Sequence, residues 1–263
     1  MQLTDALGTH HAPAEGARIV SLVPSITELL CELGLAPQLV GRTGFCIHPA
    51  ELVQAIPKIG GTKDVNIEKI RKLAPTHLIV NIDENEKPTV ETLAAFVPHV
   101  VVTHPMGPRD NLPLARLLGG IFGADARAEA WCAQFEQAYA RLEATPKGPT
   151  ATVLYCIWQD PWMAVSDDTY IARMLAQIGW RTPQLGTARY PAFSWSEAVV
   201  AGIDGVVLSS EPYRFTQAHA DALEQQIGKP VHLVDGEMMS WYGSRSLAGM
   251  GYLRELAQQG WWG

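Results

Sequence analysis

The amino-acid sequence predicts an α/β protein with two similar lobes, each containing a mainly parallel sheet, joined by one long rigid helix. Three observations carry this prediction. Short apolar runs alternate with helical stretches along the chain. One long amphipathic helix interrupts the alternation near its middle, and the residues after it repeat a pattern found before it. We expect a flexible lead-in over 1–16, a first lobe over 17–122, the linking helix over 123–148 and a second lobe over 149–263, with a ligand cleft between the lobes.

Composition is that of an ordinary globular protein and excludes several classes. Hydrophobic residues make up 47% of the 263 residues and charged residues 18%, so a sizeable core can form. A net charge of −7 and the absence of a Lys/Arg cluster argue against a nucleic-acid partner. The four cysteines are scattered without C-x-x-C spacing, which indicates neither a zinc site nor a disulfide framework. No apolar run approaches the roughly 20 residues that a membrane span needs.

The first 18 residues, MQLTDALGTHHAPAEGAR, lack the basic and apolar regions of a secretory signal. They predict either a cytoplasmic protein or one whose native signal has been replaced. His10 and His11 could form a weak metal site, but the small polar residues around them favour a disordered tail.

The first lobe contains apolar runs such as RIVSLV and HLIVN, which are typical of buried parallel strands. Gly34 ends the first helix, and the polar run DENEK separates a strand from the next helix. We expect strands at Arg18–Val23, Val40–Thr43, His77–Asn81 and Val100–Thr103, and helices at Thr27–Leu33 and Ile67–Leu73.

The linking helix is predicted over Ala124–Ala144, a length of about 31 Å. Asp125 at its start can cap free N–H groups, and Pro146 follows its end. Its apolar residues recur at helical spacing and predict one buried stripe: Ala128, Trp131, Cys132, Phe135, Ala138, Tyr139 and Leu142. An ordinary packed helix within one domain is the alternative.

The second lobe restarts the alternation. We expect strands at Ala151–Ile157, Gly205–Leu208 and Val231–Val234, and helices at Asp168–Ile178, Gln217–Gln226 and Ser246–Gln259. Counting from Glu68 and from Glu197, a branched residue follows at +2, a turn residue at +7 and a strand from about +9. This repeat favours two similar lobes.

Aromatic residues gather in the loops that follow predicted strands, where parallel α/β lobes bind their ligands. Flat aromatic faces suit a bulky organic ligand, and arginines among them could meet carboxylates or phosphates. The alternative is that most of these aromatics fill the cores. The predicted ligand-binding residues are Phe45, Trp158, Trp162, Tyr190, Phe193, Tyr213, Trp241, Tyr242 and Arg245.

Catalytic motifs are absent, because the chain has no G-x-S-x-G, P-loop, G-x-G-x-x-G or H-E-x-x-H sequence. Cys46 and His48 could form a nucleophile–base pair, but no third group orients them. Asp83, Glu84 and Glu86 form an oxygen-rich cluster most simply explained as a solvated loop. We therefore predict no catalytic residues, no bound metal and no enzyme.

Glu68 and Glu197 each lie at the start of a predicted helix, at the same place in their lobes. A carboxylate there is favoured by the helix dipole, and capping alone would explain it. Two carboxylates presented once per lobe could also dock onto basic pockets of a partner.

Three stretches together carry a family resemblance: RIVSLVPSITELLCELGL, the loop GRTGFCIHP, and GGTKDVNIEKIRKLAPTHLIV. They closely resemble the first lobe of the class III substrate-binding proteins of ABC importers. This family comprises the vitamin B12, haem and iron-siderophore receptors, also called helical backbone metal receptors. The resemblance covers about residues 17–260 in order and includes the family's rigid interlobe helix.

The resemblance implies a non-enzymatic receptor, expected as a monomer, that holds cobalamin, haem or a ferric siderophore as ligand and needs no cofactor. It implies that Glu68 and Glu197 dock onto arginines of the importer's membrane subunits, and that Phe45 flanks the ligand. Thr62, Asn81 and Ala192 stand where the B12 receptor has further cleft aromatics. The resemblance implies a location in the periplasm or at the cell surface. The lack of a signal-like pattern in the first 18 residues keeps an alternative open, a cytoplasmic enzyme or metallochaperone built on the same fold. In that alternative, Cys46 and His48 or the Asp83–Glu86 loop would form the centre.

Overall fold

A computed structural model describes residues 3–261, which divide into two compact units. Of the described residues, unit 1 comprises 3–105, 109–135 and 242–245, and unit 2 comprises 106–108, 136–241 and 246–261. The chain therefore returns to unit 1 for four residues, Tyr242–Arg245, late in the sequence.

Unit 1 contains a four-stranded, fully parallel sheet in the order β2-β1-β3-β4. Its strands are β1 (Ile19–Ser21), β2 (Leu39–Arg42), β3 (His77–Asn81) and β4 (His99–Thr103). Its helices are α1 (Pro24–Glu32), α2 (Ala50–Val53), α3 (Ile67–Lys72), α4 (Lys87–Ala94) and α5 (Asn111–Phe122), with a 3₁₀ turn at Ala36–Gln38 and another at Pro108–Asp110. The predicted strands and helices of this lobe are confirmed. The first helix begins earlier than predicted, because Pro24 suits the first turn of a helix.

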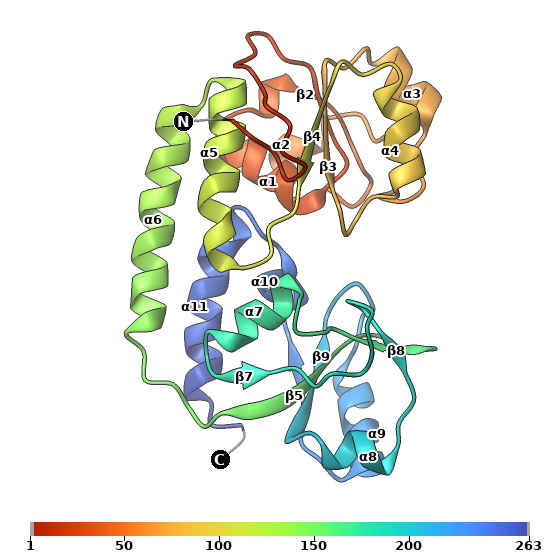
Figure 1. The fold of residues 1–263 in the computed structure, drawn as a ribbon, viewed down its shortest axis with the longest axis vertical. Coiled ribbons are helices and arrows are strands. Elements are labelled where there is room, and N and C mark those ends of the chain that lie inside the picture. The colour runs from red at the N-terminus through yellow and green to blue at the C-terminus, as the bar shows by residue number, and fades with distance from the viewer. Residues whose placement is uncertain (1–2, 262–263) are drawn as a thin grey trace. The chain divides into compact units, whose positions relative to one another are not determined.

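Helices cover both faces of this sheet, with α3 and α4 on one side (Figure 1). Ile70 of α3 and Leu93 of α4 are fully buried against Val20, Leu78 and Val80 of the sheet. This doubly covered, parallel arrangement explains why the strands are apolar throughout.

Residues 3–14 differ from the predicted flexible lead-in. Ala6 N–H donates to Val102 O of β4 at 2.9 Å, and Ala14 N–H donates to Ile121 O of α5 at 2.7 Å. The segment folds because the buried carboxylate of Asp5 accepts hydrogen bonds that no composition pattern reveals.

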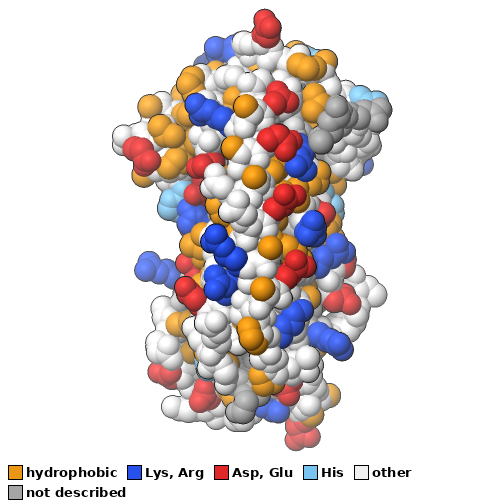
Figure 2. Space-filling view, turned by 90° about the vertical axis from the view of Figure 1, so that its left-hand side faces the viewer, with side chains coloured by type: hydrophobic (Ala, Val, Ile, Leu, Met, Phe, Trp, Pro, Cys, Tyr) orange, Lys and Arg blue, Asp and Glu red, His pale blue; other side chains and the backbone are white. Residues whose placement is uncertain are grey.

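Helix α6 (Asp125–Glu143) is the predicted linking helix and has 19 residues. Ala128, Trp131, Cys132, Phe135, Tyr139 and Leu142 are buried, which confirms the apolar stripe, although Ala138 is only half-buried. Within unit 1, Cys132 Sγ lies 3.7 Å from Leu112 O of α5. Within unit 2, Tyr139 Oη donates to Gln177 Oε1 at 2.8 Å. The face in Figure 2 mixes acidic and basic side chains with scattered hydrophobic ones.

Unit 2 contains a mixed sheet in the order β10-β9-β5-β6-β8, with β7 paired to β5. Its strands are β5 (Ala151–Trp158), β6 (Trp162–Ala164), β7 (Trp180–Arg181), β8 (Ala192–Phe193), β9 (Gly205–Ser209) and β10 (Val231–Val234). Its helices are α7 (Tyr170–Ala176), α8 (Glu197–Ala201), α9 (Gln217–Ile227), α10 (Gly236–Ser240) and α11 (Arg245–Gln258). β10, β9, β5 and β7 pair in parallel, as predicted, whereas β6 and β8 add an antiparallel edge.

The antiparallel edge corrects the expectation that Trp158 and Trp162 lie in a loop after a strand. Trp158 ends β5 and Trp162 begins β6, so a hairpin turn separates them, and Phe193 lies in β8. Trp162 of β6 stacks on Phe215 at 5.7 Å between ring centroids, and both pack on the unit 2 core.

Candidate functional site

The carboxyl edge of the unit 1 sheet is built from the loops that follow β2, β3 and β4. Backbone hydrogen bonds fix the first of them, because Gly44 N–H donates to Gly60 O at 2.7 Å. Gly60 has φ of +112°, which requires glycine at this turn. Asn85 after β3 donates from Nδ2 to Thr62 O at 3.0 Å and so joins the same set of loops. The edge is therefore held rigidly.

Three large apolar side chains project into solvent from these loops. Phe45 and Ile47, which follow β2, are 62% and 51% exposed, and Ile82, which follows β3, is 44% exposed. Phe45 was predicted to bind ligand, whereas Ile82 was not. The signal for Ile82 in the sequence is its position directly after the strand His77–Asn81, where ligand-facing residues of parallel sheets lie.

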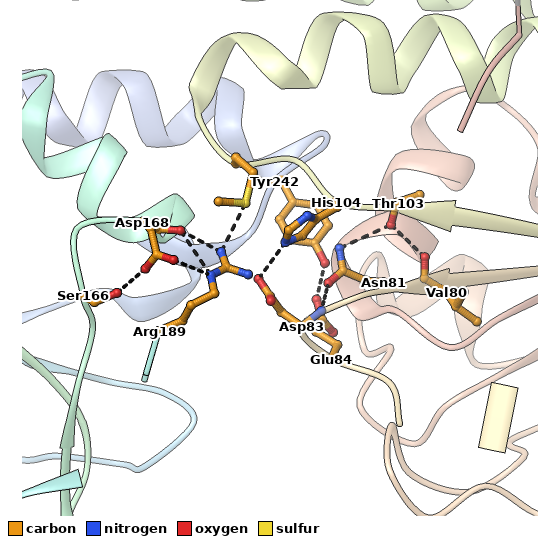
Figure 3. A network of polar contacts seen from close by, with 11 residues as sticks. Val80, Asn81, Asp83, Glu84, Thr103, His104, Ser166, Asp168, Arg189 and Tyr242 are labelled. Atoms are coloured by element: carbon orange, nitrogen blue, oxygen red, sulfur yellow. Dashed lines mark hydrogen bonds and ion pairs between the residues drawn. The ribbon is translucent and has the colours of Figure 1, made fainter. Parts of the chain in front are cut away.

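A polar network lies behind this edge (Figure 3). Asn81 Nδ2 donates to Thr103 Oγ1 at 3.3 Å, and Asn81 Oδ1 accepts from the backbone N–H of Asp83 at 2.8 Å. His104 Nε2 lies 3.5 Å from Asp83 Oδ2, and the Tyr242 hydroxyl donates to Glu84 Oε1. Asp83 and Glu84 thus have partners within unit 1, unlike the solvated cluster expected from the sequence.

The late segment Tyr242–Arg245 is held firmly in unit 1. Arg245 forms a two-point ion pair with Glu28 of α1, at 2.7 Å and 3.1 Å, and both side chains are about 85% buried. Gly243 N–H donates to Asn111 Oδ1 at 2.6 Å. Burial and the neighbouring Glu84 raise the pKa of Tyr242 well above its usual value. Arg245 and Tyr242 therefore have structural partners in addition to their predicted ligand role.

In unit 2, the last residue of β5, directly before the turn to β6, is an exposed aromatic residue. Trp158 is 40% exposed and meets Tyr213 edge-to-face at 5.5 Å. Tyr213 N–H donates to Ile157 O at 3.3 Å, which fixes the loop after β9 beside this turn. Trp158 and Tyr213 form the aromatic surface of this unit.

The other aromatics predicted to bind ligand are less accessible. Trp162 and Phe193 pack against the unit 2 core, together with Trp195, which meets Trp162 edge-to-face at 5.5 Å. Trp241 is buried, and its Nε1 donates to Glu211 Oε1 at 2.6 Å. Burial raises the pKa of Glu211, while hydrogen bonds from Ser240 and Trp241 oppose that shift.

Tyr190 is half-buried beside an anchored arginine. The guanidinium of Arg189 lies 5.9 Å from the Tyr190 ring centroid. It donates to Asp168 O from Nη2 at 2.9 Å and from Nε at 3.2 Å, while the Asp168 carboxylate accepts from Ser166 (Figure 3). Nη2 also contacts Met106 Sδ at 3.1 Å. Arg189 is thus a positioned cation that the predicted ligand set omitted.

The predicted docking carboxylates both lie in the first turn of their helices. Asn66 caps α3, accepting from Lys69 N–H at 2.8 Å, and Ser196 caps α8, accepting from Val199 N–H at 3.3 Å. Glu68 is therefore the second residue of α3, whereas Glu197 is the first residue of α8. Their positions relative to the helix start differ by one residue. Both are exposed.

The Cys46–His48 pairing is not supported by the geometry. Cys46 Sγ lies 3.1 Å from the hydroxyls of Thr27 and Thr43, and the thiol is fully buried, whereas His48 is half-buried. Burial raises the pKa of Cys46, opposite to the shift that activates a nucleophile. Among residues 3–261, no group of three or more His, Cys, Asp or Glu side chains is placed to hold a metal ion.

Comparison with known proteins identifies the family. The family model described as "periplasmic binding protein" matches residues 19–202, and the chain belongs to this family. A vitamin B12-binding protein of Pectobacterium carotovorum is 23% identical over 250 residues, covering 93% of this chain and 90% of the relative.

Solved structures share the fold. A periplasmic haem-binding protein of Roseiflexus sp. RS-1, in apo form, matches with a TM-score of 0.78 and 22% identity, covering 93% of this chain and 99% of the other. The periplasmic vitamin B12-binding protein of Vibrio cholerae matches with a TM-score of 0.75 and 16% identity, covering 93% and 99%. In the part of the chain that the structure describes, no helix has both the length and the apolar character needed to cross a bilayer.

Proposed function

We propose that this protein is the substrate-binding component of an ABC importer and carries a corrinoid, haem or ferric siderophore. Membership of the periplasmic binding protein family supports a binding role. The names of the similar proteins, which bind vitamin B12 or haem, support a large, flat metal chelate as ligand. In this proposal the protein is not an enzyme, acts as a monomer in the periplasm or at the cell surface, and treats the chelate as cargo.

One observation carries the proposal for the ligand surface. In each unit, an aromatic side chain is exposed at the carboxyl edge of the sheet, Phe45 in unit 1 and Trp158 in unit 2. Leaving a large aromatic side chain in water sacrifices the free energy of its burial, and such exposure commonly marks a binding surface. We assign Phe45, Ile82, Trp158 and Tyr213 to direct ligand contact. The remaining predicted residues, Trp162, Tyr190, Phe193, Trp241, Tyr242 and Arg245, support that surface from behind.

Mass spectrometry of the protein isolated from cells grown with all three ligand classes tests the proposal for the cargo. We expect a co-purifying tetrapyrrole or ferric chelate, retained at a stoichiometry near one. Recovery of the protein with a metal ion alone, or with a small metabolite lacking a metal, would contradict the assigned ligand class.

We further propose that Glu68 and Glu197 dock onto basic pockets of the importer's membrane subunits. Both carboxylates are exposed on short helices. Asn66 caps the first helix and Ser196 caps the second, so neither glutamate is needed as a cap. Within residues 3–261, the Glu68 carboxylate makes one loose ion-pair contact, at 3.6 Å from Arg71 Nε. A surface pair of this kind contributes little to stability, so both carboxylates can be removed without unfolding the chain.

A double variant tests docking separately from ligand binding. Glu68→Ala with Glu197→Ala should abolish association with the importer in detergent or nanodiscs and leave ligand affinity unchanged. The matched control is Glu91→Ala with Glu255→Ala, which removes two other exposed carboxylates, one from each unit. If the control weakens association equally, the effect is one of net charge and specific docking is refuted.

A further inference from the structure

Residues 43–53 of unit 1, here called the β2 loop, concentrate exposed apolar side chains. Phe45, Ile47 and Leu52 make up half of the six large apolar side chains that are exposed within residues 3–261. An exposed apolar side chain gains free energy by folding back onto nearby apolar surface, so it stays in water only where its backbone is fixed. The β2 loop must therefore be held in place from within.

One buried cation holds the β2 loop. Arg42, the last residue of β2, is 4% exposed, and its guanidinium donates to three backbone carbonyls of the loop. Nε donates to Val53 O, at the end of α2, at 2.7 Å. Nη1 donates to Cys46 O at 2.9 Å and to Thr43 O at 3.2 Å. The Arg42 side chain thus joins the two ends of the loop.

The charge of Arg42 has no carboxylate as ion-pair partner within residues 3–261. Burying a cation costs free energy unless the cation is paired or hydrogen-bonded, and an apolar side chain of similar volume would avoid that cost. What the guanidinium supplies instead is a rigid fork of charge-assisted hydrogen bonds, which are short and directional. These bonds all end on the β2 loop, so their effect is to fix its backbone.

The carbonyls that accept from Nη1 flank the turn that carries Phe45. Cys46 N–H donates to Thr43 O at 3.3 Å, which closes a turn with Phe45 as its third residue. The Thr43 hydroxyl also contacts Cys46 Sγ at 3.1 Å, and Cys46 is fully buried. The Phe45 ring lies beside Gly61, because a Cβ added to Gly61 would be 3.4 Å from Phe45 Cε2. A closed turn and a glycine that leaves room for the ring therefore define where Phe45 lies.

We propose that Arg42 is the positioning residue of the ligand surface, fixing the β2 loop so that Phe45 stays exposed beside Gly61 before any ligand arrives. The inference rests on the proposed ligand role of Phe45. Fixing an aromatic side chain in advance lowers the ordering cost of binding. If the loop of a variant holds Phe45 in this place only about a tenth of the time, its apparent dissociation constant rises about tenfold.

Nuclear Overhauser effects and amide exchange of the full chain, both without ligand, test the placement. In the wild type we expect an effect between the Phe45 ring protons and the Gly61 α-protons, and slow exchange of the Cys46 amide. In Arg42→Met both should be lost. Protection of the Leu22 amide, which is bonded to β3 and reports opening of the sheet, should fall less.

The matched control is Arg18→Met. Arg18 also belongs to unit 1 and donates to two backbone carbonyls, Leu73 O at 2.6 Å and Ala74 O at 3.1 Å, but these lie outside the β2 loop. The control should keep the ring contact and the Cys46 protection. If Arg42→Met does not fold, Arg42→Lys, which keeps the charge but lacks the planar fork, takes its place with the same direction of change.

Titration connects the placement to binding. Cyanocobalamin, haemin and a ferric siderophore are each titrated, and with the one that saturates the protein, Arg42→Met should weaken affinity about tenfold. The loss should lie in slower association, because only the form with Phe45 in place binds, while dissociation stays unchanged. Adding Arg42→Met to Phe45→Ala should have no further effect on affinity, because Arg42 acts through Phe45.

Three results would overturn the proposal. The first is an intact contact between the Phe45 ring and Gly61 in Arg42→Met. The second is equal loss of protection at Cys46 and Leu22, which would mean that the substitution loosens the whole unit. The third is an affinity loss from Arg42→Met that persists in the Phe45→Ala background. If none of the three ligands binds, the proposed function fails, and the measurements without ligand still decide the role of Arg42.

Discussion

Arg245 allows the clearest test of whether a residue predicted to bind ligand instead stabilises the fold. Its guanidinium donates two hydrogen bonds to the Glu28 carboxylate, at 2.7 Å and 3.1 Å. The Arg245 side chain is 15% exposed and the Glu28 side chain 16%. Arg245→Ala leaves the Glu28 charge buried without its partner. Removing one member of a buried ion pair typically costs 3–5 kcal/mol, so we expect about 3 kcal/mol of lost unfolding free energy at this slightly exposed site.

Urea unfolding followed by far-UV circular dichroism measures that loss, and ligand titration of the same variant measures affinity. Arg116→Ala is the matched control, because Arg116 also donates two hydrogen bonds to a carboxylate, that of Glu129, at 2.7 Å and 2.9 Å. The Glu129 side chain, however, is 56% exposed. We expect the control to lose much less stability, since water solvates the remaining carboxylate.

The double variant Glu28→Leu with Arg245→Met completes the test. Replacing both charges by apolar groups of similar size removes the stranded charge, so much of the lost stability should return. If Arg245→Ala unfolds like the Arg116→Ala control and instead loses ligand affinity, the structural reasoning is refuted and Arg245 contacts the ligand.

Three further predictions concern the site and its support. Trp158→Ala should weaken ligand binding about tenfold, equivalent to about 1.4 kcal/mol, with little change in urea midpoint because the ring is 40% exposed; an unchanged dissociation constant would remove Trp158 from the site. Gly243→Ala should cost about 1–2 kcal/mol in urea unfolding, because φ is +78° and its Cβ would lie 3.0 Å from that of Leu29; a stability equal to wild type would contradict this. The raised pKa of Glu211 means that the folded protein keeps this proton to higher pH than the unfolded chain, so unfolding free energy falls as the pH rises from about 4.5 through the folded pKa. Glu211→Gln should flatten that part of the pH profile, and an identical profile would show that Glu211 is not its source.

Local patterns sufficed for much of the fold. The strand His77–Asn81 is found with its predicted bounds, because a continuous apolar run bounded by a turn has few other solutions. The stripe of α6 was likewise readable, since helical spacing of Trp131, Phe135 and Tyr139 leaves one apolar face.

What failed depended on contacts distant in sequence. β8 has two residues and exists only because Phe193 pairs with Trp162 of β6, which no local pattern encodes. Residues 3–14 fold around Asp5, whose partner Val102 lies 97 residues away. The patterns also assign no element to Asn111–Phe122, which forms α5.

For the candidate site, the sequence named aromatic residues without ranking them by their exposure. Phe45 and Tyr242 both follow strands or helices as aromatic loop residues, yet one is 62% exposed and the other is 7% exposed. Exposure is decided by the neighbouring loops, as the Glu84 contact of Tyr242 illustrates. The anchoring of Arg189 on Asp168 and the exposure of Ile82 were missed for the same reason.

Equilibrium titration of the purified protein with cyanocobalamin, haemin and a ferric siderophore, followed by quenching of its eight tryptophans, tests the central claim most directly. We predict saturable, one-to-one quenching by one of the three at micromolar or lower concentration, weakened in both Phe45→Ala and Trp158→Ala. Absence of saturable binding by all three classes, or binding indifferent to both substitutions, would contradict the account of a chelate receptor that uses the carboxyl edges of its two sheets.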